Sequence, residues 1–198
     1  VVSCAKRLLA DEMRKLIERR VFTKTERQIR EAVTLAFCEV DEKLRATMPE
    51  NDGSGSTVVC AVVCPDPSRG DGGYRVILIN CGDSRGLASV GGELVGTVDH
   101  KPDNPLERKR VEAAGGFLSQ NGGWRVDGIL AVSRGLGDFS LKRGDLPAEQ
   151  QKVSTVPDVT FHQCKRGDWL CLASDGVFDE ASNADVQECV EVRDQVEP

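Results

Sequence analysis

The sequence is poor in several features that would point to particular functions. It has two histidines and no Cys-x-x-Cys pair among its eight cysteines, so the ligand spacing of a structural zinc site is missing. Acidic residues outnumber basic ones, 32 to 26, and the net charge of −6 argues against the basic face of a nucleic-acid-binding protein. No apolar run reaches membrane-spanning length, and no secretory signal opens the chain. We therefore expect an intracellular protein, cytoplasmic or nuclear, that binds neither nucleic acid nor membranes.

The length and the composition indicate one folded unit. A chain of 198 residues suits a single domain with a substantial core. Hydrophobic residues make up 39% of the chain and charged residues 29%, which is ordinary for a globular protein. We treat residues 1–198 as one domain and expect it to be a monomer.

Two amphipathic helices are predicted before the first strand. Apolar residues recur at spacings of three and four, which places them on one face of each helix. Thr23 and Glu26 have the spacing of a capping box, so the second helix is expected to start there. The apolar positions are Val2, Ala5, Leu9, Met13 and Leu16 in the first helix and Ile29, Val33, Ala36, Val40 and Leu44 in the second.

Three nearly continuous apolar runs, at 57–63, 76–79 and 169–173, predict strands. Runs without polar alternation are typical of strands that are covered on both faces. Asn104, followed by Pro105 and then Glu107, predicts the start of a further helix. The pattern favours an α+β fold in which two sheets pack face to face with helices outside them.

Two of these strands lead into an aspartate that has a glycine beside it. The run at 169–173 leads into Asp175, with Asp179 four positions later, and the run at 76–79 leads into Asp83. Carboxylates on rigid strand ends suit a hard, oxygen-ligated divalent cation. Asp and Gly are also common in turns, so ordinary turn caps are the alternative.

Seven short motifs follow one another along most of the chain, and their order resembles the motif series of the type 2C serine/threonine protein phosphatases. Any one of them is weak evidence, whereas the ordered set is specific. The motifs are GSGST at 53–57, NCGDSR at 80–85, DHKP at 99–102, ER at 107–108, AAGG at 113–116, RVDGILAVSRGLGD at 125–138 and ASDGVFD at 173–179.

The resemblance implies a fold, an activity and a cofactor. The fold is an antiparallel β-sandwich of two sheets between layers of helices, in the order α-β-β-α. The activity is hydrolysis of phosphoserine and phosphothreonine in phosphoprotein substrates by a metal-activated water. The cofactor is Mg²⁺ or Mn²⁺, as two core ions plus a weaker third. By the resemblance, Asp175 is a ligand of the core pair, and Asp83 and Asp179 join it at the third ion. Residues 139–154 match the flap beside the active site, which we expect to be mobile.

Other motif residues are interpreted as scaffold. His100 is expected to form a hydrogen bond that holds a loop, in preference to a catalytic role. Arg125 and Arg134 could bind phosphate or form buried ion pairs, and the ion pairs are favoured.

The chain departs from the family pattern at both ends, so the fold is expected to be incomplete. The Asp-Gly-His-Gly-Gly motif and the final Asp-Asn pair are absent, and this interpretation takes the sequence as a truncated domain. With no catalytic residue retained beyond the metal ligands, the piece alone is expected to be inactive although its parent is an enzyme. The alternative is a non-catalytic domain of this type that binds other proteins. The three retained carboxylates favour the enzyme, because clustered negative charges repel one another unless a cation holds them.

Overall fold

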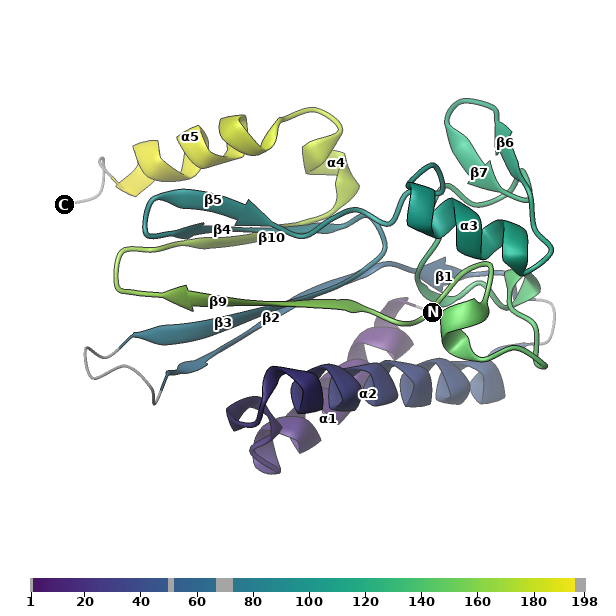
Figure 1. Ribbon diagram of the computed structural model, residues 1–198, viewed down its shortest axis with the longest axis horizontal. Helices are drawn as coiled ribbons and strands as arrows, with labels where there is room; N and C mark the ends of the chain where they lie inside the picture. The colour runs from purple at the N-terminus through teal and green to yellow at the C-terminus, as the bar shows by residue number, and fades with distance from the viewer. Residues whose placement is uncertain (1, 50–51, 67–72, 195–198) are drawn as a thin grey trace.

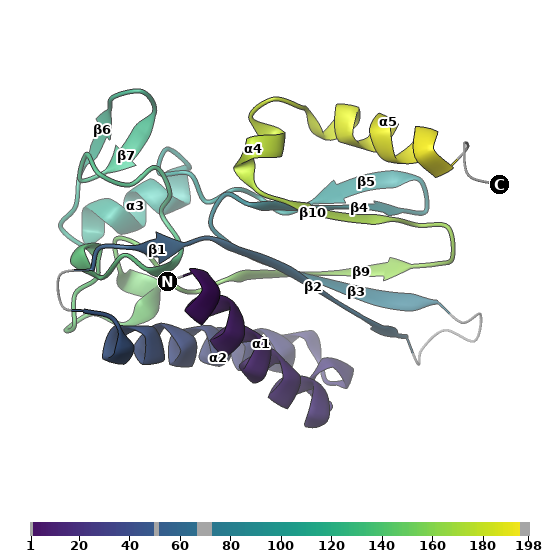
Figure 2. The same ribbon diagram turned by 180° about the vertical axis from the view of Figure 1, so that it is seen from behind.

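The computed structural model describes residues 2–49, 52–66 and 73–194. Its first three elements are α1 (Val2–Glu18), the 3-10 turn η1 (Val21–Thr23) and α2 (Glu26–Thr47), and the two helices form one outer layer (Figures 1 and 2). The predicted apolar stripe of α2 is buried along its whole length, which confirms the helical pattern. No helix among the described residues is both long and apolar enough to span a membrane.

The start of α2 differs from the prediction by two residues. Thr25, and not Thr23, caps the helix, and it exchanges capping-box hydrogen bonds with Gln28. Arg20 adopts a left-handed backbone conformation that turns the chain into η1, where Phe22 is buried. The Thr23 hydroxyl donates to the Arg20 carbonyl at 2.8 Å and closes that turn. Both threonines fit the sequence pattern, and the burial of Phe22 selects the second.

In the described residues, two three-stranded antiparallel sheets form the centre, and two short ribbons lie beside them. Figures 1 and 2 show the two large sheets stacked, with α1 and α2 below one and α5 (Asn183–Asp194) above the other. This is the expected α-β-β-α order, so the predicted fold class is confirmed. The first sheet has the order β2 (Val58–Pro65), β3 (Tyr74–Cys81), β9 (Asp158–Cys164), and the second has the order β10 (Leu170–Ala173), β4 (Arg85–Val90), β5 (Glu93–Gly96). The ribbons pair β1 (Gly55–Ser56) with β8 (Leu136–Gly137) and β6 (Leu118–Gln120) with β7 (Trp124–Val126).

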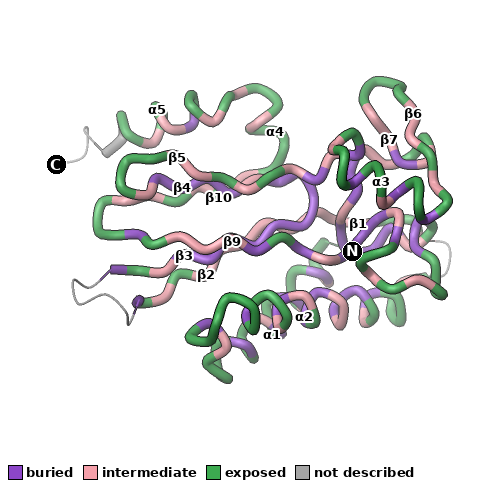
Figure 3. Tube along the Cα trace, viewed as in Figure 1, coloured by how far each residue is buried: buried purple, intermediate pink, exposed green. Residues whose placement is uncertain are grey.

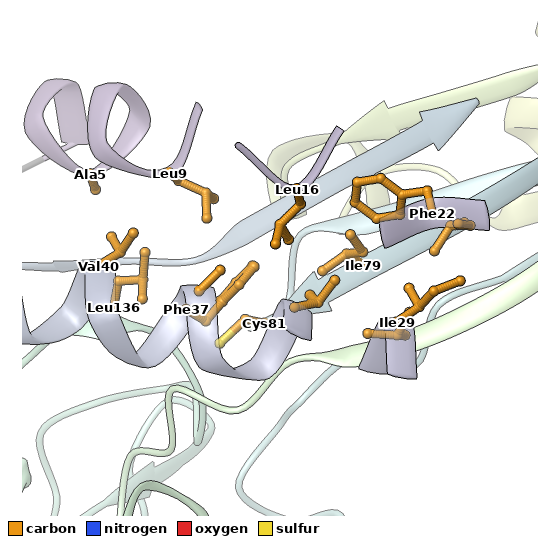
Figure 4. Close-up of a cluster of buried hydrophobic side chains, with 14 of the residues drawn as sticks. Ala5, Leu9, Leu16, Phe22, Ile29, Phe37, Val40, Ile79, Cys81 and Leu136 are labelled. Atoms are coloured by element: carbon orange, nitrogen blue, oxygen red, sulfur yellow. The ribbon is translucent and has the colours of Figure 1, made fainter. Parts of the chain in front are cut away.

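The main core lies between the helical layer and the first sheet. Figure 4 shows side chains of α1 and α2 facing β3, with Phe37 and Ile79 among them. Both are fully buried, and burial of a side chain of this size stabilises a fold by about 2–3 kcal/mol. A smaller cluster of Val76, Leu78 and Cys164 lies on the other face of the same sheet.

The prediction that all three apolar runs are covered on both faces is correct only for β3. Buried positions run along β3 from Val76 to Cys81 (Figure 3). Strand β2 is mostly half-buried, and on β10 Leu170 and Leu172 keep 37% and 40% of their surface exposed. The reason is position, because β2 and β10 are edge strands of their sheets in the described part of the chain. An edge strand has a neighbour on one side only, which leaves more of its surface in solvent.

Helix α3 (Pro105–Ala113) begins where the sequence predicts. The Asn104 carboxamide oxygen accepts a hydrogen bond from the Leu106 N–H at 3.0 Å, and Pro105 occupies the first turn. Glu107 on this helix is buried and forms an ion pair with Arg110, one turn later, at 2.7 Å.

Residues 139–154, the expected flap, are anchored at both ends and exposed in the middle. They contain two 3-10 turns, η2 (Phe139–Leu141) and η3 (Ala148–Gln150). Lys142 near one end and Gln151 near the other are buried, whereas residues 143–145 are exposed. The Gln151 carboxamide hydrogen-bonds the main chain of Arg143 and Leu146 and so closes the segment on itself. Its mobility stays a prediction.

Candidate functional site

Strand register brings two of the three candidate aspartates to one end of the second sheet. The β4–β10 ladder is antiparallel, and its last pair joins Ala173 to Arg85. Asp175 lies two residues after Ala173, and Asp83 lies two residues before Arg85. Both aspartates therefore leave the ladder at the same end, although 92 positions separate them in the chain (175 − 83 = 92).

Asp83 lies where the chain crosses from the first sheet to the second. Gly82 has φ +121°, and a Cβ there would come within 2.3 Å of the Thr57 side chain, so only glycine fits this turn. The Thr57 hydroxyl hydrogen-bonds the Ser84 hydroxyl at 2.8 Å. Two motifs that are far apart in the sequence, at 53–57 and 80–85, thus pack together and fix the backbone around Asp83.

The other two aspartates lie at the two ends of the short helix α4 (Asp175–Phe178), which follows β10: Asp175 begins it and Asp179 caps it. Asp175 is its first residue, and its carboxylate accepts a hydrogen bond from the Gly176 N–H at 2.9 Å. Asp179 follows one turn later, where its N–H donates to the Asp175 carbonyl at 2.8 Å. Both residues are exposed, so their carboxylates are accessible to a ligand from solvent.

Lys101 is the partner of Asp83, a contact that the sequence analysis did not predict. The Lys101 ammonium donates to the Asp83 carboxylate, whose side chain is only 8% exposed. Burial works against a charged lysine here. The hydrogen bond to Asp83 and the attraction of Asp83, Asp179 and Asp99 outweigh it, so the pKa of Lys101 is raised. The cluster therefore carries a permanent positive charge among its carboxylates.

Arg85 connects this cluster to the helices above the second sheet. Its guanidinium forms a two-pronged ion pair with Asp99, at 2.9 and 2.7 Å. It also donates to the Asn183 side chain at 2.6 Å and lies 4.5 Å from the centre of the Phe178 ring. The hydrogen bond to Asp99, together with the attraction of Asp99 and Asp179, raises the pKa of Arg85 against the effect of burial. Arg85 thus holds α4 and the start of α5 in place.

His100 has the structural role that the sequence suggested. Its Nδ1 accepts a hydrogen bond from the Gly82 N–H at 3.0 Å, so in the neutral ring the proton is on Nε2. That nitrogen lies 3.2 Å from the Asp158 carboxylate. The contact with His100, together with Arg134, lowers the pKa of Asp158 to about 2. His100 therefore links the turn that carries Asp83 to the start of β9.

The two motif arginines behave differently. Arg134 forms ion pairs with the buried Glu107, at 2.7 Å, and with the half-exposed Asp158, at 2.9 Å, and the first of these agrees with the favoured interpretation. Arg125 does not follow it. In the part of the chain that the structure covers, its guanidinium donates to the main-chain carbonyls of Asn121 and Ile129. The β6–β7 ribbon carries few side-chain carboxylates, so the open carbonyls at its turns are the acceptors within reach.

The side chains do not by themselves form a metal centre. Among the described residues, no three His, Cys, Asp or Glu side chains lie close enough together to hold a metal ion. Carboxylate oxygens are the right ligands for Mg²⁺ or Mn²⁺, and the register places the backbones of Asp83 and Asp175 at one end of a sheet. The Asp83 carboxylate, however, is held by Lys101. The three aspartates thus suit a hard cation in chemistry but not in their present arrangement, and their role as ligands stays a prediction.

Comparison with known proteins gives one consistent result. The profile of the family described as "Protein phosphatase 2C" matches residues 2–197. The chain is 40% identical over 161 residues to mouse "Probable protein phosphatase 1N", covering 80% of this chain and 37% of that protein. It is 40% identical over 159 residues to rice "Probable protein phosphatase 2C 8", covering 78% of this chain and 36% of that protein. The chain thus spans just over a third of the length of these relatives.

Solved structures agree with the sequence comparisons. The crystal structure of a phosphatase from a pathogenic strain of Toxoplasma gondii superimposes with a TM-score of 0.70 at 30% sequence identity. The superposition covers 85% of this chain and 66% of that structure. The fold is therefore shared over most of the chain.

Proposed function

Because the chain belongs to the protein phosphatase 2C family, we propose that the whole protein hydrolyses phosphoserine and phosphothreonine in phosphoprotein substrates by a metal-activated water. The observation that carries the proposal is the β4–β10 register, which brings Asp83 and Asp175 to one end of the second sheet, with Asp179 one helical turn away. Dependence on divalent metal ions is general for this family. A protein-binding module without catalysis has no need to keep three aspartates near the same strand ends.

Further parts of the proposal rest on the family resemblance. The cofactor is Mg²⁺ or Mn²⁺, as two core ions with Asp175 among their ligands, and a weaker third ion bound by Asp83, Asp175 and Asp179. Residues 139–154 act as the flap that influences substrate choice. An intracellular location, cytoplasmic or nuclear, fits the eight cysteines, all of which are free thiols. We propose that the protein works as a monomer.

The test is a Mn²⁺-dependent assay of the natural-length protein with a phosphothreonine peptide. We expect turnover that requires Mn²⁺ and that falls by at least about a thousandfold in Asp175→Ala, since loss of one anionic ligand disorganises a metal-dependent step. Asp11→Ala is the control, because Asp11 forms an exposed ion pair with Arg14 on α1. Turnover that is equal with and without Mn²⁺, or unaffected by Asp175→Ala, would show that the proposed function is wrong. The 198-residue chain, assayed beside it, is expected to show little turnover.

A further inference from the structure

We propose that Lys101 is a built-in counter-ion of Asp83, which a divalent cation must displace and which therefore lowers the cation affinity of this site. The inference deepens the proposed function, since it rests on Asp83 being a metal ligand. It concerns a residue of this chain that the resemblance leaves without a role.

The contact itself shows how the lysine blocks the carboxylate. The Lys101 ammonium donates to Oδ2 of Asp83, and the Asp83 side chain is 8% exposed, so the carboxylate has little room for a second charged partner. The backbone on which Asp83 stands is fixed by the Gly82–His100 hydrogen bond and by the Thr57–Ser84 contact. The Asp83 carboxylate is therefore not free to bind a cation while it is paired with Lys101.

The charge balance explains why a cation belongs here. Asp83, Asp179 and Asp99 all attract the Lys101 ammonium. Asp99 is paired with Arg85 through two hydrogen bonds, and Lys101 is the cation that contacts Asp83. The single charge of Lys101 does not balance the three carboxylates assigned to the third ion, Asp83, Asp175 and Asp179, and a divalent cation brings their sum closer to neutral. The lysine therefore keeps Asp83 compensated when no cation is bound, and it competes with one that arrives.

The surroundings of Lys101 allow the exchange without movement of the main chain. Its neighbours are anchored, Asp99 through Arg85 and His100 through the Gly82 N–H, and Pro102 follows directly. The Lys101 side chain is 39% exposed and has a flexible four-carbon stem, so its ammonium can withdraw into solvent. A rotation of this side chain frees Asp83 on a backbone that is already in place.

The experiment measures Mn²⁺ binding to the 198-residue chain by calorimetry and by the electron paramagnetic resonance signal of free Mn²⁺, with no substrate present. Lys101→Met removes the competing charge and should lower the Kd for Mn²⁺ by at least about tenfold. Lys101→Arg keeps the charge and should keep the weak affinity. Lys152→Met is the matched control. Lys152 forms a similar part-buried ion pair with Asp127, with 2.6 Å between the ammonium and the carboxylate, and this pair lies away from the site. The Kd of this variant for Mn²⁺ should equal that of the wild type.

Two further variants locate the effect. Asp83→Asn, combined with Lys101→Met, should abolish the gain in affinity, because the freed ligand is then lost. Lys101→Gln gives a second neutral variant whose thermal unfolding can be matched to the wild type if Lys101→Met is unstable.

The inference is overturned if both neutral variants leave the Kd unchanged or raise it, if Lys101→Arg binds as tightly as Lys101→Met, or if the gain survives in Asp83→Asn. A natural-length protein without phosphatase activity would instead overturn the proposed function, since Mn²⁺ binding is measured here without catalysis.

Discussion

The ammonium of Lys142 donates to both carboxylate oxygens of Asp41, at 2.9 and 2.8 Å, and so joins residues 139–154 to helix α2. Both side chains are nearly inaccessible, with 3% and 11% exposure. The Gly137 N–H donates to the same carboxylate at 2.7 Å, so Asp41 also holds the strand that precedes the expected flap. The segment is therefore tethered to the helical layer through one buried ion pair.

Loss of this ion pair should destabilise the whole chain. Lys142→Met leaves the Asp41 carboxylate buried with one hydrogen bond, and we expect the free energy of unfolding to fall by about 3 kcal/mol. Urea denaturation measures the change. The control is Arg143→Ala, which removes an exposed pair with Asp145 and should leave the free energy of unfolding nearly unchanged. Equal effects of the two substitutions would contradict the tether.

The neighbouring Asp138 should make stability depend on pH. Burial, reinforced by Asp41 and opposed by Lys142, raises its pKa to about 6, above the 3.8 of an ordinary aspartate. The folded state therefore binds a proton more tightly than the unfolded state, and this residue's contribution to stability is lost as pH rises from about 4 through about 6.

Asp138→Asn tests this pH dependence, and asparagine tolerates the left-handed backbone at this position, where φ is +51°. We expect the variant to be more stable than the wild type by up to about 2 kcal/mol at pH 8, after allowance for solvent screening, and by little at pH 4.5. Urea midpoints at the two pH values measure the difference. A gain of the same size at both would show that the Asp138 charge is not its source.

Hydrogen exchange should separate the anchored ends of residues 139–154 from their middle. Residues 143–150 contain few buried side chains, so their amides should exchange at least about a hundredfold faster than those of β3. Lys142 and Val153 are buried residues, and their amides should exchange more slowly than those of residues 143–150. Protection of the middle equal to that of β3 would refute the mobility expected of a flap.

Truncation of a core side chain sets the scale for these effects. Phe37 on α2 is fully buried against β3, and Phe37→Ala should lower the free energy of unfolding by about 3–5 kcal/mol. Leu35→Ala on the same helix is the control, because Leu35 is 60% exposed and should change stability by about 0.5 kcal/mol or less. Similar losses for both would mean that α2 packs by another face.

Local patterns in the sequence were enough to predict much of the fold. The apolar stripe of α2, the cap of α3 at Asn104 and the two-sided burial of β3 all follow from spacing within one element. The errors arose where two neighbouring residues could each cap the same helix, or where the burial of a strand depends on which strands lie beside it. Thr23 and Thr25 offered equivalent caps, and the exposure of Leu172 reflects its place on an edge strand.

The candidate site was predicted only in part. The motif series indicated Asp83, Asp175 and Asp179, and the register explains how the first two meet at one end of a sheet. The pairing of Asp83 with Lys101, across 18 positions, could not be predicted, because nothing local fixes which of several nearby cations reaches a carboxylate. The only signal was that Lys101 stands in the same motif as His100.

The most direct test of the account is to locate bound Mn²⁺ by anomalous diffraction in crystals of the natural-length protein. The account expects a peak within about 2.0–2.6 Å of carboxylate oxygens of Asp175, and a weaker peak shared by Asp83 and Asp179 from which the Lys101 ammonium has moved away. Peaks only at other residues, with the Lys101–Asp83 ion pair intact at saturating Mn²⁺, would contradict it.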